Sequence, residues 1–302
     1  MLNVYEQVDS NKRKSFLIMV LFVLFVTGII YLFNTVLDFG TGWLGIALIF
    51  SGLSSLGSYY WGDKFILAIS GARPADRKRD FTFYTVTENL CLAASLPMPK
   101  LYVINDTAPN AFATGRDPQH ATVCSTTGLL SKLNRTELEG VIAHELSHVR
   151  NYDTRLMAVV TILIGMIALI SDWFMRSLWW RDRDRDRGGN LQAILLVVAI
   201  IAAILAPIIG QLMQLAISRR REFFADASGV MLTRQPGGLI SALKKISGDT
   251  EPLEAANRAT ASLYIINPFK SSRGQQFVGW FSRLFDTHPP ISERIKALEG
   301  ME

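Results

Sequence analysis

Cysteine is scarce in this chain of 302 residues, where Cys91 and Cys124 are the only two. Neither belongs to a close pair, so the sequence excludes the framework of several disulfides on which small secreted domains rely. It also excludes a structural zinc site built of cysteines, which needs closely spaced thiols. We therefore expect both residues to be free, half-buried thiols of a protein that folds in a reducing compartment.

Charge is likewise absent from long stretches of the chain, two of them near its start. Residues 15–37 form an uncharged run of 23 residues, more than the roughly 20 that a helix needs to cross a bilayer. The run follows the basic triplet 12–14, but it is too long for a signal-peptide core and no small-residue cleavage site follows it. We interpret it as an uncleaved anchor. Residues 39–62 are again uncharged, and the single Asp38 between the two runs predicts a tight membrane hairpin.

Two later uncharged runs predict a second hairpin of less regular length. Residues 156–171 give 16 uncharged positions, and residues 188–218 give 31, more than a bilayer needs. Such lengths suit tilted or partly embedded helices. Hydrophobic residues make up 49% of the chain. We therefore predict a multi-pass helical membrane protein.

Basic residues indicate how these spans are oriented. The net charge is 31 − 26 = +5, and Lys and Arg gather beside the spans on one side, at 12–14 and 219–221 among other places. By the positive-inside rule, both termini and the segments 63–155 and 219–302 are expected in the cytoplasm. Arg and Asp alternate from 181 to 187, so their charges nearly cancel. That stretch therefore predicts a solvated loop, with no nucleic acid as a partner.

Between the two hairpins the sequence predicts mixed α and β structure. A helix is expected over residues 81–95, ended by Pro97. Residues 100–104 and 121–126 are short runs bounded by turn residues, which predicts two strands. Residues 110–115 suit either an edge strand or a loop. The expected fold class is therefore mainly α, with an α+β domain attached to the membrane helices.

A long helix with a metal-binding pattern is predicted from Thr136, which forms a capping-box pattern with Glu139. On this helix His144 and His148 lie one turn apart, so both imidazoles can bind one zinc ion. Glu145 between them can reach the attacking water, accept its proton and later deliver that proton to the leaving amine. An apolar stripe covers the opposite side of the helix, formed by Leu138, Ile142, Leu146 and Val149.

A catalytic zinc ion needs a third protein ligand, and Glu222 is the strongest candidate. Asp226 follows one turn later, where its carboxylate can hydrogen-bond a ligand histidine and fix its tautomer. Both residues belong to a stripe of polar residues that recur at three- and four-residue steps. This stripe explains why the run 188–218 is longer than a membrane span. We expect the end of the run to leave the bilayer as a helix that carries Glu222 to the metal. The alternative is that Glu222 only pairs with the arginines at 219–221. The polar stripe consists of Gln211, Gln214, Ser218, Glu222 and Asp226.

Four motifs together resemble one known family. They are His-Glu-Leu-Ser-His at 144–148, Glu-Phe-Phe-Ala-Asp at 222–226, Asn-Ala-Phe-Ala-Thr-Gly at 110–115, and Thr-His-Pro-Pro at 287–290 followed by Arg294. Their order along essentially the whole chain resembles the HtpX family of bacterial heat-shock membrane proteases, which is grouped with the CAAX prenyl endopeptidases. The resemblance implies a zincin-like catalytic domain on the cytoplasmic face, with one Zn²⁺ per chain and a glutamate as the third ligand.

The resemblance also implies roles that spacing alone does not assign. Asn110 and Ala111 would lie on the strand that binds the substrate backbone by β-addition. His288, as a catalytic residue, or Arg294, as a substrate-binding residue, would face the tetrahedral oxyanion or its surroundings. An equal alternative for His288 is a structural hydrogen bond at the entry of a helix, because it precedes Pro289.

The expected organisation has four parts. They are the N-terminal tail with the first hairpin at 1–62, the first part of the catalytic domain at 63–155, the second hairpin at 156–218, and the second part of the catalytic domain at 219–302.

By the same resemblance, the expected function is endoproteolysis of misfolded or damaged membrane proteins during stress-related quality control, in the bacterial inner membrane. The expected partners are protein substrates and the lipid bilayer. Two alternatives remain open at this point: a protease that processes prenyl peptides, and a membrane scaffold or chaperone without turnover. The sequence indicates neither the oligomeric state nor the preferred cleavage site.

Overall fold

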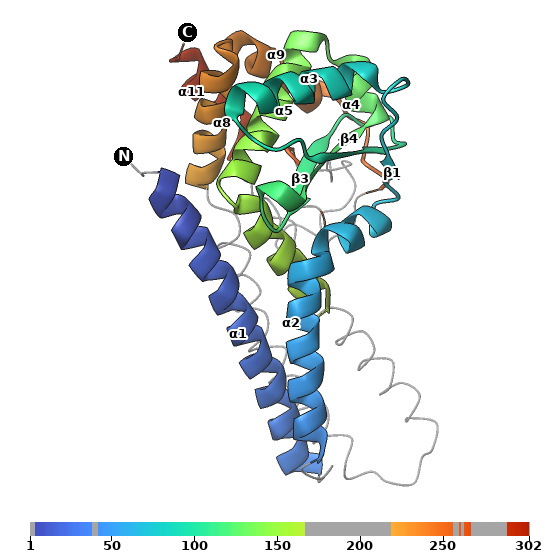
Figure 1. Ribbon diagram of the computed structural model, residues 1–302, viewed down its shortest axis with the longest axis vertical. Helices are drawn as coiled ribbons and strands as arrows, with labels where there is room; N and C mark the ends of the chain where they lie inside the picture. The colour runs from blue at the N-terminus through green and yellow to red at the C-terminus, as the bar shows by residue number, and fades with distance from the viewer. Residues whose placement is uncertain are drawn as a thin grey trace.

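The computed structural model describes residues 4–37, 42–166, 219–255, 260, 263–266 and 289–301. Two long helices, α1 (Val4–Leu37) and α2 (Gly42–Ile69), run side by side away from a compact body (Figure 1). The body contains the small sheet and the remaining labelled helices. The second predicted hairpin, 156–218, lies mostly outside the described residues, because only 156–166 of it are described, as helix.

The sheet has four strands in the order β1-β2-β4-β3. β2 (Lys100–Ile104) and β4 (Ala121–Thr126) are parallel neighbours at its centre, and both have the predicted bounds. β3 (Ala111–Gly115) pairs antiparallel with β4 at one edge, which confirms the edge-strand alternative for this segment. β1 (Arg73–Pro74) forms the other edge.

Helices cover the sheet, and α5 (Arg135–Arg150) is the central one. The predicted apolar stripe of α5 lies wholly in the main core cluster, together with residues of the sheet and of the other helices. Around α5 pack α3 (Phe81–Ala94), α8 (Arg219–Thr233) and α9 (Pro236–Gly248). Two shorter helices also belong to the described part of the body, α4 (Thr127–Lys132) and α11 (Ile291–Glu299).

The capping box at the start of α5 lies two residues earlier in the chain than predicted. The side chain of Asn134 accepts from the backbone N of Glu137, and the carboxylate of Glu137 accepts from the backbone N of Asn134. The box forms here because Glu137 is buried and its carboxylate is also held by Ser241 and Lys245 of α9. Glu139, by contrast, pairs with Arg135 on the surface.

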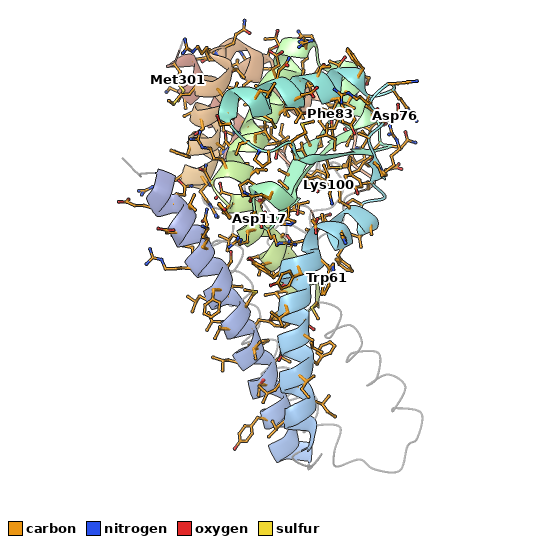
Figure 2. All side chains as sticks on the ribbon, in the orientation of Figure 1. Trp61, Asp76, Phe83, Lys100, Asp117 and Met301 are labelled. Carbon is orange, nitrogen blue, oxygen red and sulfur yellow. The ribbon has the colours of Figure 1, made fainter. Side chains whose placement is uncertain are left out.

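The two long helices join the body through apolar contacts. Residues 153–166 continue as a helix below α5, and Leu156, Val159 and Leu163 pack against Ile18 and Phe22 of α1. Figure 2 shows Trp61 on the part of α2 that adjoins the body. Within the described residues, no helix combines the length and the hydropathy of a membrane span. The predicted spans therefore stay a prediction.

The two cysteines are free, as predicted, but both are fully buried instead of half-buried. Cys91 lies in the main core, and Cys124 in a second cluster beside α2.

Candidate metal centre

Two helices bring the three predicted metal ligands together. α5 carries His144 and His148, and α8 carries Glu222 in its first turn. The Nε2 atoms of the two histidines are 3.2 Å apart. The carboxylate oxygens of Glu222 lie 3.7 Å from Nε2 of His144 and 3.5 Å from Nε2 of His148. Among the residues that the structure describes, this is the one group of His, Cys, Asp and Glu side chains arranged to hold a metal ion.

The spacing of these donor atoms fits zinc. Zinc binds nitrogen and oxygen at about 2.0–2.1 Å, and two corners of a tetrahedron are separated by about 1.6 bond lengths, or about 3.3 Å. The donor atoms of His144, His148 and Glu222 are 3.2–3.7 Å apart. Two imidazoles and one carboxylate are also a donor set that catalytic zinc sites use, with the fourth position left open for water or substrate.

A glycine allows the two helices to approach at this point. A Cβ atom on Gly229 of α8 would lie 3.1 Å from the backbone N of His144. α8 therefore packs directly on the backbone of α5 beside the ligand. Glu222 and Asp226 precede Gly229 at helical spacing, so their carboxylates face the same side.

The first histidine is held by a carboxylate that is held in turn by an arginine. Nδ1 of His144 lies 2.8 Å from Oδ1 of Asp226. The guanidinium of Arg294 donates to both oxygens of Asp226, at 2.8 and 2.6 Å. Burial alone would raise the pKa of Asp226, but Arg294 and His144 outweigh it and keep that pKa below its ordinary value. Asp226 is therefore an ionised partner that leaves Nε2 of His144 facing the metal position.

The second histidine has a matching carboxylate that the sequence analysis missed. Nδ1 of His148 lies 3.0 Å from Oδ2 of Asp153, and Arg221 lies 3.5 Å from the other oxygen of Asp153. Asp153 follows the end of α5, so helical periodicity did not single it out. The only signal in the sequence was an acidic residue just beyond the histidine helix.

The surrounding carboxylates change the protonation of His148. Burial lowers the pKa of its imidazole, but the hydrogen bond with Asp153 and the charges of Glu222, Asp153 and Glu145 outweigh burial and raise that pKa to about 9. The metal-free site therefore holds a proton at neutral pH, which a metal ion has to displace.

Glu145 is buried next to the ligands, with 3% of its surface exposed. Its negative charge contributes to the raised pKa values of both His148 and Arg294. The glutamate that we predicted to be the general base therefore lies within electrostatic reach of the metal position.

Asn110 and Ala111 lie at the edge strand, but other parts of the chain already contact them. The side-chain amide nitrogen of Asn110 donates to the backbone carbonyl of Ile266 at 3.0 Å. The carbonyl of Ala111 accepts from the backbone N of Ile265 at 3.0 Å. Their role in substrate binding stays a prediction, and a peptide that used the Ala111 carbonyl would compete with Ile265.

The two candidates near the C-terminus differ in what the structure describes. Arg294 of α11 is fully buried. Besides Asp226, its guanidinium contacts the carbonyl of Ile265 at 3.2 Å, and it lies 3.6 Å from Glu222. These contacts make Arg294 a support for the ligands, whereas its predicted contact with substrate stays untested. His288 lies outside the described residues.

Two histidines one helical turn apart, an adjacent glutamate and a carboxylate from a second helix define the class of metallopeptidases. Residues 78–302 match peptidase family M48, and the chain belongs to this family. It is similar to proteins named Protease HtpX homolog from Caldanaerobacter subterraneus subsp. tengcongensis, with 45% identity over 99% of this chain and 98% of that protein. The proteins of the same name from Lactobacillus helveticus and Tropheryma whipplei are 44% and 41% identical, each over 99% of this chain and over 100% and 98% of their own lengths.

This chain is also similar to a solved structure. The crystal structure of S. mikatae Ste24p matches with a TM-score of 0.48 and 18% sequence identity, and the match covers 90% of this chain and 62% of that one. This chain therefore spans less than two thirds of the length of that protein.

Proposed function

We propose that this chain is a zinc-dependent endopeptidase of a bacterial membrane that hydrolyses misfolded or damaged membrane proteins. The observation that carries the zinc-dependent activity is the donor set of His144, His148 and Glu222, whose spacing fits one zinc ion. Membership of peptidase family M48 supports peptide-bond hydrolysis.

The residues of the site have separate roles in the proposed reaction. When bound, zinc supplies a Lewis acid that polarises the scissile carbonyl and makes water nucleophilic at neutral pH. Glu145 takes a proton from the attacking water and passes it to the leaving amine, as a general base and then a general acid. Asp226 and Asp153 hold the two imidazoles with Nδ1 occupied, so that Nε2 stays available to the metal.

Exposed apolar side chains on the two long helices support the membrane location. Phe16 and Leu24 of α1 are 67% and 63% exposed, and Ile49 and Leu53 of α2 are each 65% exposed. A soluble monomer rarely exposes so many large apolar side chains on one pair of helices. With the basic residues next to them, these helices favour insertion with the catalytic domain in the cytoplasm.

The experiment that tests the activity compares the wild-type chain with Glu145→Gln. Both proteins are purified in detergent, stripped of metal and reloaded with Zn²⁺, and cleavage of casein and self-cleavage are measured. Glu145→Gln is expected to keep one zinc ion per chain and to lose about 10²–10⁴-fold in rate, the usual contribution of a general base. Equal cleavage by the two proteins would mean that Glu145 is not the base.

A matched control lies on the same helix. Glu139→Gln removes a carboxylate that pairs with Arg135 on the surface of α5. This variant is expected to cleave casein at the wild-type rate. A prenylated peptide and an unfolded membrane protein, offered side by side, then test the substrate class: faster cleavage of the prenylated peptide would contradict the proposed role in quality control.

A further inference from the structure

An asparagine at the start of the first helix contacts the support of the metal centre. Asn11 of α1 is 1% exposed. Its amide nitrogen donates to the backbone carbonyl of Asn151 at 2.9 Å and to Oδ1 of Asp153 at 2.7 Å. Its amide oxygen accepts from Arg221 at 3.4 Å. Both hydrogens and the oxygen of one side-chain amide are thus used.

These contacts reach a metal ligand through a single intermediate residue. Asp153 is 3% exposed and presents Oδ2 to Nδ1 of His148, while Oδ1 faces Asn11 and Arg221. A buried carboxylate oxygen without a partner costs free energy, so contacts to both oxygens favour one orientation of the carboxylate. Asn11 therefore helps to hold the oxygen that does not face the histidine, and so sets the direction of the one that does.

We infer that Asn11 is a positioning residue of the metal centre, acting through Asp153 on His148. The first helix is therefore a structural part of the zinc site as well as an anchor. Partners of a ligand histidine typically change metal affinity by 10–100-fold. Because Asn11 is one contact further away, its loss is expected to weaken zinc binding by about tenfold. The inference rests on the proposed zinc site and is independent of the substrate.

The test measures zinc affinity in the full-length protein in detergent micelles, by competition with a chromophoric chelator. Asn11→Leu keeps the number and branching of the side-chain heavy atoms and removes all three hydrogen bonds. Its zinc dissociation constant is expected to rise about tenfold. Asn11→Ala removes the same three hydrogen bonds without added bulk or charge, so it tests the same contact if the leucine variant does not fold.

A neighbouring residue provides the matched control. Ser15 lies one turn later on the same buried face of α1, and its hydroxyl donates only within the helix, to the carbonyl of Asn11 at 2.8 Å. Ser15→Ala is expected to bind zinc as the wild type does. A change in both variants would indicate general loosening of α1 and would overturn the inference.

The route through Asp153 is tested by combining substitutions. Asp153→Ala alone is expected to weaken zinc binding by about 10–100-fold, and adding Asn11→Leu to it should then change the affinity less than twofold. A full additional tenfold loss in the double variant would show that Asn11 acts by another route. A wild-type protein that binds zinc, with unchanged affinity in Asn11→Leu, would refute the inference alone. A wild-type protein that binds no zinc would refute the proposed site as well.

Discussion

At the scale of single residues, two similar series of contacts support the candidate metal centre. In one, Arg294 holds Asp226 and Asp226 faces His144. In the other, Arg221 lies against Asp153, which faces His148. Each imidazole is thus oriented by a carboxylate that has its own cationic partner, so the ligands are fixed before a metal ion arrives.

Arg294→Met is expected to disrupt the first series of contacts, from Arg294 through Asp226 to His144. Methionine has nearly the volume of the arginine stem but leaves Asp226 and Glu222 without their buried guanidinium. Removing one partner of a buried ion pair typically costs about 3–5 kcal/mol of stability. Denaturant unfolding of the metal-free protein in micelles measures this loss.

The same variant has an expected pH dependence. In the wild type the pKa of Asp226 is below its ordinary value, so its contribution to stability is present above pH 4 and is lost as the pH falls through the lowered pKa. Without Arg294, burial raises that pKa above its value in the unfolded chain, so the folded variant binds the proton more tightly and should gain stability as the pH falls towards 4, opposite to the wild type. Superimposable stability curves for the two proteins between pH 4 and 7 would contradict this expectation.

The pKa of His148 predicts that zinc binding releases a proton. The metal-free imidazole has a pKa of about 9, so at pH 7 it is protonated and zinc has to displace the proton. The apparent zinc affinity should therefore rise with pH, by about tenfold per unit up to pH 9, from this group. Calorimetric titrations in buffers of different ionisation enthalpy measure the number of protons released. The Asp153→Ala variant, which lacks the hydrogen-bonded carboxylate, should release fewer at pH 8.

At the scale of helices and strands, close packing around α5 depends on glycine. A Cβ atom on Gly140 would lie 2.8 and 2.9 Å from backbone atoms of Leu239 in α9. Backbone cannot rotate out of the way as a side chain can, so α9 has to shift. Gly140→Ala is expected to lower the free energy of unfolding by about 1–3 kcal/mol, as overpacking of a core does.

Gly248, the last residue of α9, is the control for this prediction. A Cβ atom there meets nothing within 4 Å, so Gly248→Ala should leave stability unchanged or slightly raised. Thermal unfolding of both variants in the same detergent compares them. Equal stability of the two would mean that α9 is not held against Gly140.

Local sequence patterns predicted the elements of the body well. The strands 100–104 and 121–126 have the expected bounds because turn residues limit short buried runs on both sides. The capping box was misplaced because two patterns, two residues apart, both fit the local rule. Contacts with Ser241 and Lys245, more than 100 residues later in the chain, accompany the box that forms.

The three candidate metal ligands could also be predicted from local patterns, but the residues that hold them in place could not. His144 and His148 follow from helical spacing, and Glu222 from a polar stripe on a helix. Asn11 is 142 residues from Asp153, and only the fold brings the two together. No pattern within α1 distinguishes this asparagine from a solvated residue beside the basic triplet.

At the scale of the whole molecule, the exposed apolar surface of α1 and α2 predicts how the protein behaves in cells. The chain is expected to remain in the membrane fraction after extraction with alkaline carbonate, because many large apolar side chains on these helices are exposed in the described part of the chain. Immunoblotting of both fractions measures this, with a peripheral membrane protein as the control that is released. Full release of the chain into the soluble fraction would contradict the membrane location.

Both edges of the small sheet are partly blocked against pairing with other polypeptides. β1 is only two residues long and includes Pro74, which has no N–H to offer, and the carbonyl of Ala111 in β3 is engaged by Ile265. Free strand margins recruit sticky, unfolded chains and nucleate aggregates. A protease that is proposed to bind such chains is therefore less prone to aggregate with its own substrates. A substrate segment that pairs with the Ala111 carbonyl of β3 has to displace Ile265.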